Sequence, residues 1–190
     1  MAGAGEKEIK RAIAKAWKVQ GFIRRGEARF LYTLARRKGN IVELGCWMGR
    51  STIILAQAAG VWGAHLTSVD PFSGMPHKIP SGSSKEWAKN LRFVGIDPPE
   101  LLEMTSYEAG NIYDKEIALL FIDGNHAKGR VLHDLNQWTP KIKIGGFVAL
   151  HDMFYPSIRG VAEAVVEWWQ GDVWELVGLV NFTIAFRRLK

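Results

Sequence analysis

The chain has only one cysteine, Cys46, among its 190 residues, so it cannot form an internal disulfide bond. It also lacks an apolar run near the roughly 20 residues that cross a bilayer, and its start, MAGAGEKEIKR, lacks the apolar core of a secretory signal. The G-x-G-x-x-G pattern of dinucleotide-binding turns is absent as well. These absences predict a cytoplasmic protein with no disulfide framework, no membrane partner and no pyrophosphate cradle.

Basic residues are concentrated near the start of the chain. Residues 1–38 contain 11 Lys or Arg and three Glu, whereas the remaining residues sum to a net charge of −2. Such a segment fits a nucleic acid, a phosphorylated substrate or an anionic surface as partner, or else a solvated pair of amphipathic helices. Because no motif that reads RNA or DNA accompanies it, the helix pair is the preferred interpretation.

The spacing of apolar residues predicts an α/β fold. Ile9, Ile13 and Trp17 form one helical stripe within residues 6–20, and a second helix is expected over 26–38. Short apolar runs typical of strands then occur, with helical patterns between most of them, at residues 41–45, 65–70, 100–105, 117–123 and 146–152. This alternation favours a doubly wound, mostly parallel sheet with helices on both faces.

The end of the chain departs from this alternation. A helix is expected around 157–169, and the apolar runs 173–180 and 181–189 then follow each other almost directly. So short a connection permits only an antiparallel hairpin. The basic helical segment 1–38 and the α/β region 39–190 are expected to form one structural domain.

A glycine-rich turn follows the first expected strand, in the sequence IVELGCWMGRS. Gly45 and Gly49 let the backbone turn sharply and approach a ligand closely, and the amides near Ser51 begin a helix. Asp70 ends the next strand, where a carboxylate is placed to accept the hydroxyls of a ribose. Turn and acid together predict a ligand that contains a ribose. The alternatives are a purely structural turn and a turn or cap role for Asp70.

The sequence E-L-G-x-x-x-G-R-S followed by S-V-D resembles the cofactor site of class I S-adenosylmethionine-dependent methyltransferases. Residues 118–152, ALLFIDGNHAKGRVLHDLNQWTPKIKIGGFVALHD, are similar to the metal-binding half of the O-methyltransferases that act on catechols and macrolide sugars. The resemblance covers about residues 38–190 and implies the seven-stranded, Rossmann-like methyltransferase sheet. It also implies S-adenosylmethionine as cofactor, with Glu43, Gly45, Gly49 and Ser51 at its methionine part, Asp70 at its ribose, Ser106 with Tyr107 near its adenine, and Trp47 and Asp123 as further contacts.

A metal site is expected beside the cofactor. Asp123 and the pair His151 and Asp152 close two strands that this fold sets side by side, so their side chains should converge at its carboxyl edge. Mg²⁺ is expected for oxygen ligands, and Mn²⁺ or another transition metal if His151 coordinates. Relatives often carry Asp or Glu in place of His151, so a hydrogen-bonding or core role for this histidine stays open.

His126 lies three residues after Asp123, where related enzymes keep a proton acceptor, and it is the candidate general base. The alternative is a histidine that caps or flanks the next helix. In that helix, Asp134 is expected to make a structural hydrogen bond or to face solvent.

These residues predict an O-methyltransferase in which an ion acidifies a hydroxyl of a small acceptor, His126 removes the proton and the oxygen attacks the methyl group. Residues 71–84 are expected to form a mobile loop that shapes the pocket. Two other classes stay open. One is a nucleic-acid-binding protein that grips phosphates with residues 1–38; the other is a nicotinamide-dependent oxidoreductase, against which the glycine spacing counts. The family implies that a homodimer is plausible.

Overall fold

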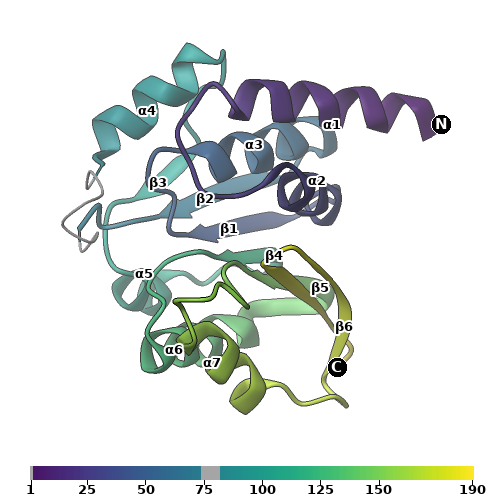
Figure 1. The fold of residues 1–190 in the computed structure, drawn as a ribbon, viewed down its shortest axis with the longest axis vertical. Coiled ribbons are helices and arrows are strands. Elements are labelled where there is room, and N and C mark those ends of the chain that lie inside the picture. The colour runs from purple at the N-terminus through teal and green to yellow at the C-terminus, as the bar shows by residue number, and fades with distance from the viewer. Residues whose placement is uncertain (1, 74–81) are drawn as a thin grey trace.

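The computed structural model describes residues 2–73 and 82–190, so most of the loop expected over 71–84 lies outside the described residues. A seven-stranded sheet forms its centre (Figure 1). The strands are β1 (Asn40–Leu44), β2 (His65–Val69), β3 (Glu100–Leu102), β4 (Ile117–Ile122), β5 (Ile142–Leu150), β6 (Trp174–Val180) and β7 (Thr183–Arg188).

The strand order is β3-β2-β1-β4-β5-β7-β6. All pairs from β3 to β5 are parallel, whereas β7 runs antiparallel to both β5 and β6. The expected doubly wound, mostly parallel sheet with an antiparallel hairpin at its end is therefore confirmed. The hairpin forms because only two residues separate β6 from β7.

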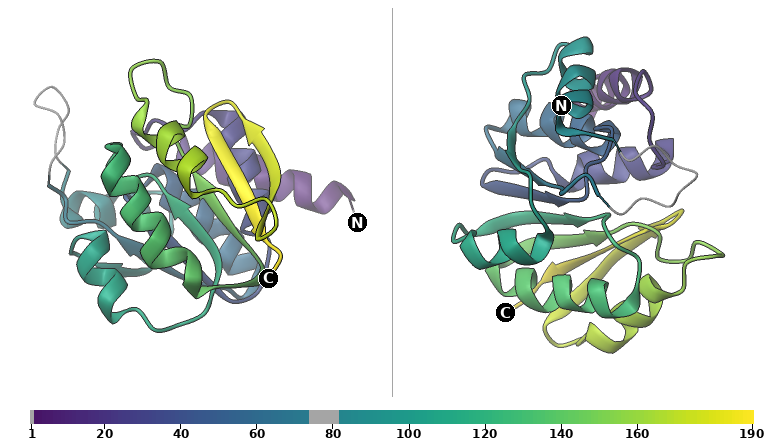
Figure 2. Two further views of the ribbon diagram at one scale, coloured as in Figure 1. Left: turned by 90° about the horizontal axis from the view of Figure 1, so that it is seen from below. Right: turned by 90° about the vertical axis from the view of Figure 1, so that its left-hand side faces the viewer.

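Helices cover both faces of the sheet (Figures 1 and 2). One face carries α1 (Ala2–Ala16), α2 (Arg25–Leu34), α3 (Arg50–Trp62) and α4 (Ser84–Phe93). The other carries α5 (Ser106–Ile112), α6 (Lys128–Trp138) and α7 (Gly160–Trp168), and a 3-10 turn, Thr139–Lys141, leads from α6 into β5. Leu119 and Phe121 of β4 face the first layer and Leu120 and Ile122 the second, so the strand is apolar throughout.

The basic N-terminal helices are part of the core. Ile9, Ala12 and Ile13 of α1 are buried in the same cluster as α3, and both α1 and α2 pack against α3. Exposed lysines such as Lys7 and Lys10 lie on the opposite side of α1. Among the described residues, no helix has the length and apolar character that crossing a bilayer requires.

The topology brings the ends of β1, β2, β4 and β5 together. The amide of Gly45 donates to the carbonyl of Val69 at 2.8 Å, and the amide of Asp123 donates to the carbonyl of Leu44 at 2.8 Å. The amide of His151 likewise donates to the carbonyl of Ile122 at 3.0 Å. Residues that follow these strands therefore share one edge, where the strand order reverses and α/β proteins bind ligands.

Candidate active site

The glycine-rich turn is built against the end of β4. Gly45 has a φ of +86°, and a Cβ atom there would lie 2.2 Å from the carbonyl oxygen of Asp123. Gly49 has a φ of +95°, and its Cβ would lie 2.6 Å from Leu91. Both positions need glycine for conformation and for space, so the turn is fixed in shape before any ligand is considered.

Asp70 holds this turn from the neighbouring strand. Its Oδ2 accepts hydrogen bonds from the amides of Cys46 and Trp47, both at 2.8 Å, and its Oδ1 accepts one from the amide of Phe72 at 2.7 Å. A carboxylate has about four acceptor sites, so these bonds leave little capacity for a further donor. Asp70 therefore shapes the turn, and its contact with a ribose stays a prediction.

Glu43 lies behind the turn and is fully buried. Its Oε2 accepts hydrogen bonds from Thr52 Oγ1 and Ser68 Oγ, each at 2.7 Å, while its Oε1 has no hydrogen-bond partner in the described part of the chain. Burial raises the pKa of Glu43 to about 7, although hydrogen bonds, including one from Ser51, oppose the rise. Oε1 is excluded from solvent, so the contact of Glu43 with a cofactor stays a prediction.

A cavity of about 650 Å³ opens at this edge of the sheet. This size is within the range of small-molecule sites. Seven of the predicted site residues line it, namely Gly45, Trp47, Ser51, Asp123, His126, His151 and Asp152. The glycine-rich turn and the acidic and histidine residues thus face one space.

Five predicted site residues do not line this cavity, namely Glu43, Gly49, Asp70, Ser106 and Tyr107. Ser106 begins α5 and donates to Asp134 Oδ1 at 2.6 Å, and the exposed Tyr107 ring lies 5.2 Å from the ring of His133. Asp134 is buried, so it makes the structural hydrogen bond and does not face solvent. Adenine contacts of Ser106 and Tyr107 stay predictions.

The N-terminal segment forms one wall of the cavity, which the sequence interpretation missed. Arg50 of α3 donates from Nε to the carbonyl of Val19 at 2.9 Å and from Nη1 to that of Gly21 at 2.6 Å. The ring of Phe22 stacks on Trp47 with 4.9 Å between centroids. Residues 19–22 are therefore fastened to the glycine-rich turn by a guanidinium and an aromatic pair.

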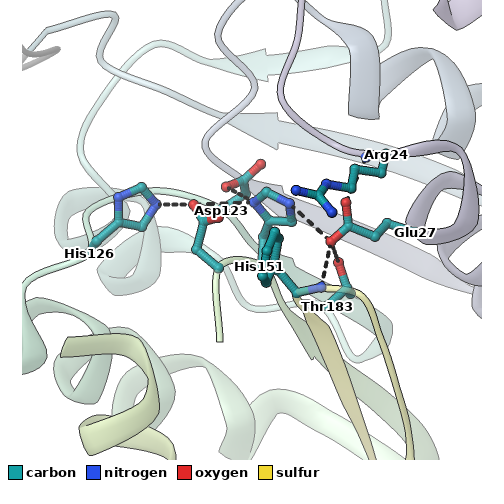
Figure 3. A network of polar contacts seen from close by, with 8 residues as sticks. Arg24, Glu27, Asp123, His126, His151 and Thr183 are labelled. Atoms are coloured by element: carbon teal, nitrogen blue, oxygen red, sulfur yellow. Dashed lines mark hydrogen bonds and ion pairs between the residues drawn. The ribbon is translucent and has the colours of Figure 1, made fainter. Parts of the chain in front are cut away.

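His151 lies at the centre of a polar network (Figure 3). Its side chain is 3% exposed, and its Nδ1 lies 3.2 Å from Asp123 Oδ1 and 3.3 Å from Asp152 Oδ2. On the other side of the ring, Nε2 lies 3.4 Å from Glu27 Oε1. Both ring nitrogens therefore face carboxylates.

Glu27 is the residue of this network that the sequence did not point to. It is 1% exposed, and its Oε1 accepts hydrogen bonds from the amide of Phe182 at 2.9 Å and from Thr183 Oγ1 at 3.3 Å. Its Oε2 accepts the amide of Arg24 at 2.6 Å. A signal did exist, because Glu27 stands four residues before the buried Leu31, on the apolar stripe of an otherwise basic helix.

His126 approaches the same carboxylates from the opposite side. Its Nε2 lies 3.1 Å from Asp152 Oδ2, and its side chain is partly exposed at the cavity. Hydrogen bonding to Asp123 and then to Asp152 raises the pKa of His126 to about 9. The predicted general base is thus placed in the cavity next to the predicted metal ligands.

The charges of the network are strongly coupled. Burial lowers the pKa of His151, but the charge of Asp123 and contacts with Asp123, Asp152 and Glu27 outweigh it and raise this pKa to about 12. Burial raises the pKa of Asp152, yet hydrogen bonds from His126 and His151 bring it below its usual value. The two aspartates are therefore ionised at neutral pH and attract cations.

The donor set fits a divalent ion. One ligand atom each from Asp123, His126 and Asp152 lies within 4.8 Å of the others. The distances of 3.2 and 3.3 Å from His151 Nδ1 to the two aspartates are close to the roughly 3 Å between neighbouring ligand atoms around an ion with bonds of about 2.1 Å. Asp123, His126 and Asp152 thus form one group that could hold an ion, and His151 Nδ1 lies next to the two carboxylates of this group.

Fold and site together define a class I S-adenosylmethionine-dependent methyltransferase. The model of a family described as a methyltransferase domain matches residues 42–153, and the chain belongs to this family. The matched segment runs from the middle of β1 to the residue after Asp152, so it includes the glycine-rich turn and the polar network but not Glu27.

Three similar proteins give the range of relatives. The chain is 30% identical over 154 residues to an uncharacterized protein, y4gI, of Sinorhizobium fredii (strain NBRC 101917 / NGR234). The aligned segment covers 78% of this chain and 16% of that protein. The chain thus spans about a sixth of the length of this relative.

Two solved structures share the fold. The O-methyltransferase NovP matches with a TM-score of 0.75 and 18% identity, over 88% of this chain and 81% of NovP. The methyltransferase PaMTH1 of Podospora anserina, bound to SAH, matches with a TM-score of 0.64 and 15% identity, over 100% of this chain and 94% of PaMTH1.

Proposed function

We propose that this methyltransferase transfers a methyl group from S-adenosylmethionine to a hydroxyl oxygen of a small acceptor, with a divalent ion beside the cofactor. The observation that carries the proposal is that one cavity is lined both by the glycine-rich turn and by Asp123, His126, His151 and Asp152. Methyl transfer to oxygen needs the methyl donor and a group that removes a proton on two sides of one space. The fold shared with NovP supports oxygen as the acceptor atom.

The cofactor would lie along the turn after β1. Gly45, Gly49 and Ser51 would hold its methionine part, and Glu43 would support the turn from behind through Thr52 and Ser68. Asp70 would meet the ribose, Trp47 would contact the cofactor from the turn, and Ser106 and Tyr107 would lie near the adenine. When bound, the cofactor supplies a methyl group activated by a sulfonium centre.

The ion would be held by Asp123, His151 and Asp152, with Mg²⁺ or Mn²⁺ as candidates. When bound, it supplies positive charge that acidifies an acceptor hydroxyl and stabilises the resulting oxyanion. Asp123 and Asp152 would fix the position of the ion and thereby the position of the acceptor hydroxyl that binds to it. Asp152 has a φ of +60°, in the left-handed region that is uncommon for residues other than glycine.

His126 would accept the proton from the acceptor. It is partly exposed and lies at the cavity side of Asp152, with 3.1 Å between Nε2 and Oδ2. The aspartates that hold its pKa at about 9 are the same groups that a cation would neutralise, so ion binding would lower this pKa toward neutral. A positioned base of this kind contributes about 10² to 10⁴ in rate.

The test starts with isothermal titration of S-adenosylmethionine and S-adenosylhomocysteine, with and without Mg²⁺ or Mn²⁺. Labelled methyl transfer to catechols, small phenols and sugars then identifies the acceptor. With that acceptor, His126→Gln should lower kcat by about 10² or more and leave cofactor binding intact, while His133→Gln, an exposed histidine outside the cavity lining, should behave as wild type. No binding of either cofactor form would overturn the proposal, and transfer only to nitrogen or carbon acceptors would overturn its oxygen specificity.

A further inference from the structure

Two histidines compete for the place of the ion's nitrogen ligand. His151 Nδ1 lies within 3.3 Å of carboxylate oxygens of both Asp123 and Asp152, and His126 Nε2 lies 3.1 Å from Asp152. One histidine cannot both ligate the ion and accept the substrate proton. The proposed function therefore depends on which of the two is the ligand.

Of the two histidines, His151 has a further carboxylate behind its ring, and His126 has none among the residues that the structure describes. Its Nε2 faces Glu27 at 3.4 Å, on the side of the ring away from the two aspartates (Figure 3). Histidines that bind metals almost always donate their other ring N–H to a carboxylate, a carbonyl or water, which fixes the tautomer and the ring orientation. For His126, the contacts found in the described ranges of the chain are with Asp152 and Asp123, the carboxylates that would themselves bind the ion.

Glu27 is itself held rigidly. Its two oxygens receive the amides of Arg24 and Phe182 and the hydroxyl of Thr183, and its side chain is excluded from solvent. These donors come from the start of α2 and the start of β7, so the carboxylate is fixed between two elements of the core. With three donors on its two oxygens, the Glu27 carboxylate is fixed in place and presents Oε1 to His151.

We propose that Glu27 is the positioning residue that makes His151, and not His126, the nitrogen ligand of the ion. The proposal rests on the ion site of the proposed function. In the structure, Nδ1 of His151 lies at hydrogen-bond distance from Asp123 Oδ1, 3.2 Å, so a ligand role requires that the proton on Nδ1 be released to solvent. Glu27 would then hold the remaining hydrogen on Nε2, and the Nδ1 lone pair would be directed between Asp123 and Asp152. His126 then remains available as the proton acceptor. A nitrogen ligand also moves the preference of the site from Mg²⁺ toward Mn²⁺, Fe²⁺, Co²⁺ or Zn²⁺.

The test measures Mn²⁺ binding to the full chain, by isothermal titration and by the electron paramagnetic resonance signal of free Mn²⁺. Glu27→Gln should weaken binding by about 10- to 100-fold, the usual effect of losing such an outer partner. His151→Gln should weaken it at least as much, and His126→Gln should leave it near the wild-type value. Glu163→Gln is the matched control, since it makes the same change at an exposed glutamate of α7 outside the cavity lining, and it should bind Mn²⁺ as wild type does.

A spectroscopic readout separates positioning from general damage to the fold. In Mn²⁺-loaded protein labelled with ¹⁵N-histidine, one nitrogen coupling should be present in wild type and His126→Gln, and absent in His151→Gln. If Glu27→Gln does not fold, the wild type alone can still test the inference. NMR of its Zn²⁺ form should show that Nε2 of His151 carries the hydrogen and that Nδ1 binds the metal. Equal Mn²⁺ affinity of folded Glu27→Gln and wild type, or a coupling that is lost in His126→Gln, would overturn the inference.

Failure of the proposed function would look different. A wild-type chain that binds S-adenosylhomocysteine but neither Mn²⁺, Mg²⁺ nor Zn²⁺ would overturn the ion site and the role of Glu27 together. A wild-type chain that binds Mn²⁺ with nitrogen coupling from His126 would keep the ion site and overturn only the assignment made by Glu27.

Discussion

Asp70 Oδ2 accepts a hydrogen bond from the amide of Cys46 at 2.8 Å, which joins the end of β2 to the turn that follows β1. The same carboxylate also receives two further amides, so Asp70 both shapes the turn and is the predicted ribose ligand. Asp70→Ala should lower the free energy of unfolding by about 1–3 kcal/mol, because part-buried amides lose their acceptor. It should also abolish measurable binding of S-adenosylhomocysteine.

Titration calorimetry with thermal denaturation checks both effects, and Asp97→Ala serves as an exposed control. Asp70→Asn separates the two roles, since it keeps one acceptor oxygen and loses the charge. If Asp70→Ala lowered stability and left cofactor affinity unchanged, its role would be structural and the ribose prediction would be wrong.

Substitution by alanine should have opposite effects on the fold at Gly45 and at Gly60. Gly45→Ala would bring its Cβ to 2.2 Å from the carbonyl of Asp123, at a φ of +86°, so it should disrupt the turn and remove cofactor binding. Gly60 lies inside α3, and a Cβ there meets nothing within 4 Å. Gly60→Ala should therefore raise the free energy of unfolding by about 0.5–1 kcal/mol.

Chemical denaturation and titration of S-adenosylhomocysteine on both variants test this pair. A destabilised Gly60→Ala would contradict the helix geometry described for α3. A Gly45→Ala variant with wild-type affinity would contradict the close packing of the turn against β4.

The sheet could be predicted because each strand carries its own signal. The run 117–122 is apolar at every position since both faces are covered, and the two residues between β6 and β7 leave only a hairpin. The convergence of Asp123, His126, His151 and Asp152 followed from their places after parallel strands. The sequence therefore allowed the prediction of those site residues that follow the ends of strands.

The other half of the site was not predicted, because it comes from contacts between distant segments. Glu27 lies 124 residues before His151 in the chain, and the two meet where the start of α2 contacts the β6–β7 hairpin. Glu27, embedded among arginines, has the composition of a solvated helix, and its burial appears only against the apolar stripe of Leu31 and Leu34. The cavity wall made by residues 20–24 is likewise held by Arg50, which no local sequence pattern links to that segment.

Glu43 should make stability depend on pH. Its pKa in the fold is about 7, against 4.5 as the ordinary value, because burial disfavours its charge. Between these values the folded chain keeps a proton that the unfolded chain releases, so the free energy of unfolding falls as pH rises from about 4.5 to 7 and levels off above that. The full effect is on the order of 3 kcal/mol.

Glu43→Gln should remove this component while keeping an acceptor oxygen for Thr52 and Ser68. Urea denaturation of wild type and Glu43→Gln at about pH 5 and about pH 7.5 measures the contribution of Glu43 to the free energy of unfolding. The histidines and aspartates of the site contribute equally to the two proteins, so their effect cancels in the difference. The difference in stability between variant and wild type should move in favour of the variant at the higher pH. A difference that does not change with pH would show that the Glu43 pKa is not raised.

The basic segment 1–38 should behave as part of the core and not as a removable arm. Deleting it would expose the side of α3 against which Ile9, Ala12, Ile13 and Leu31 pack, and would remove the Phe22 wall of the cavity. Because the net stability of a domain is only about 5–15 kcal/mol, the loss of this apolar contact should give an unfolded chain. Loss of RNA retention in that deletion would therefore say nothing about nucleic acid.

Substitution of exposed lysines tests nucleic-acid binding without this problem. Lys7→Gln, Lys10→Gln and Lys18→Gln together remove three charges that lie in solvent and leave the buried stripe of α1 intact. If residues 1–38 are a solvated layer of the enzyme, filter retention of RNA at low salt should be weak in the wild type and unchanged in the triple variant, while affinity for S-adenosylhomocysteine stays the same. Strong, salt-sensitive retention that the triple variant loses would instead make RNA a partner, because phosphate contacts contribute affinity through the counterions they release.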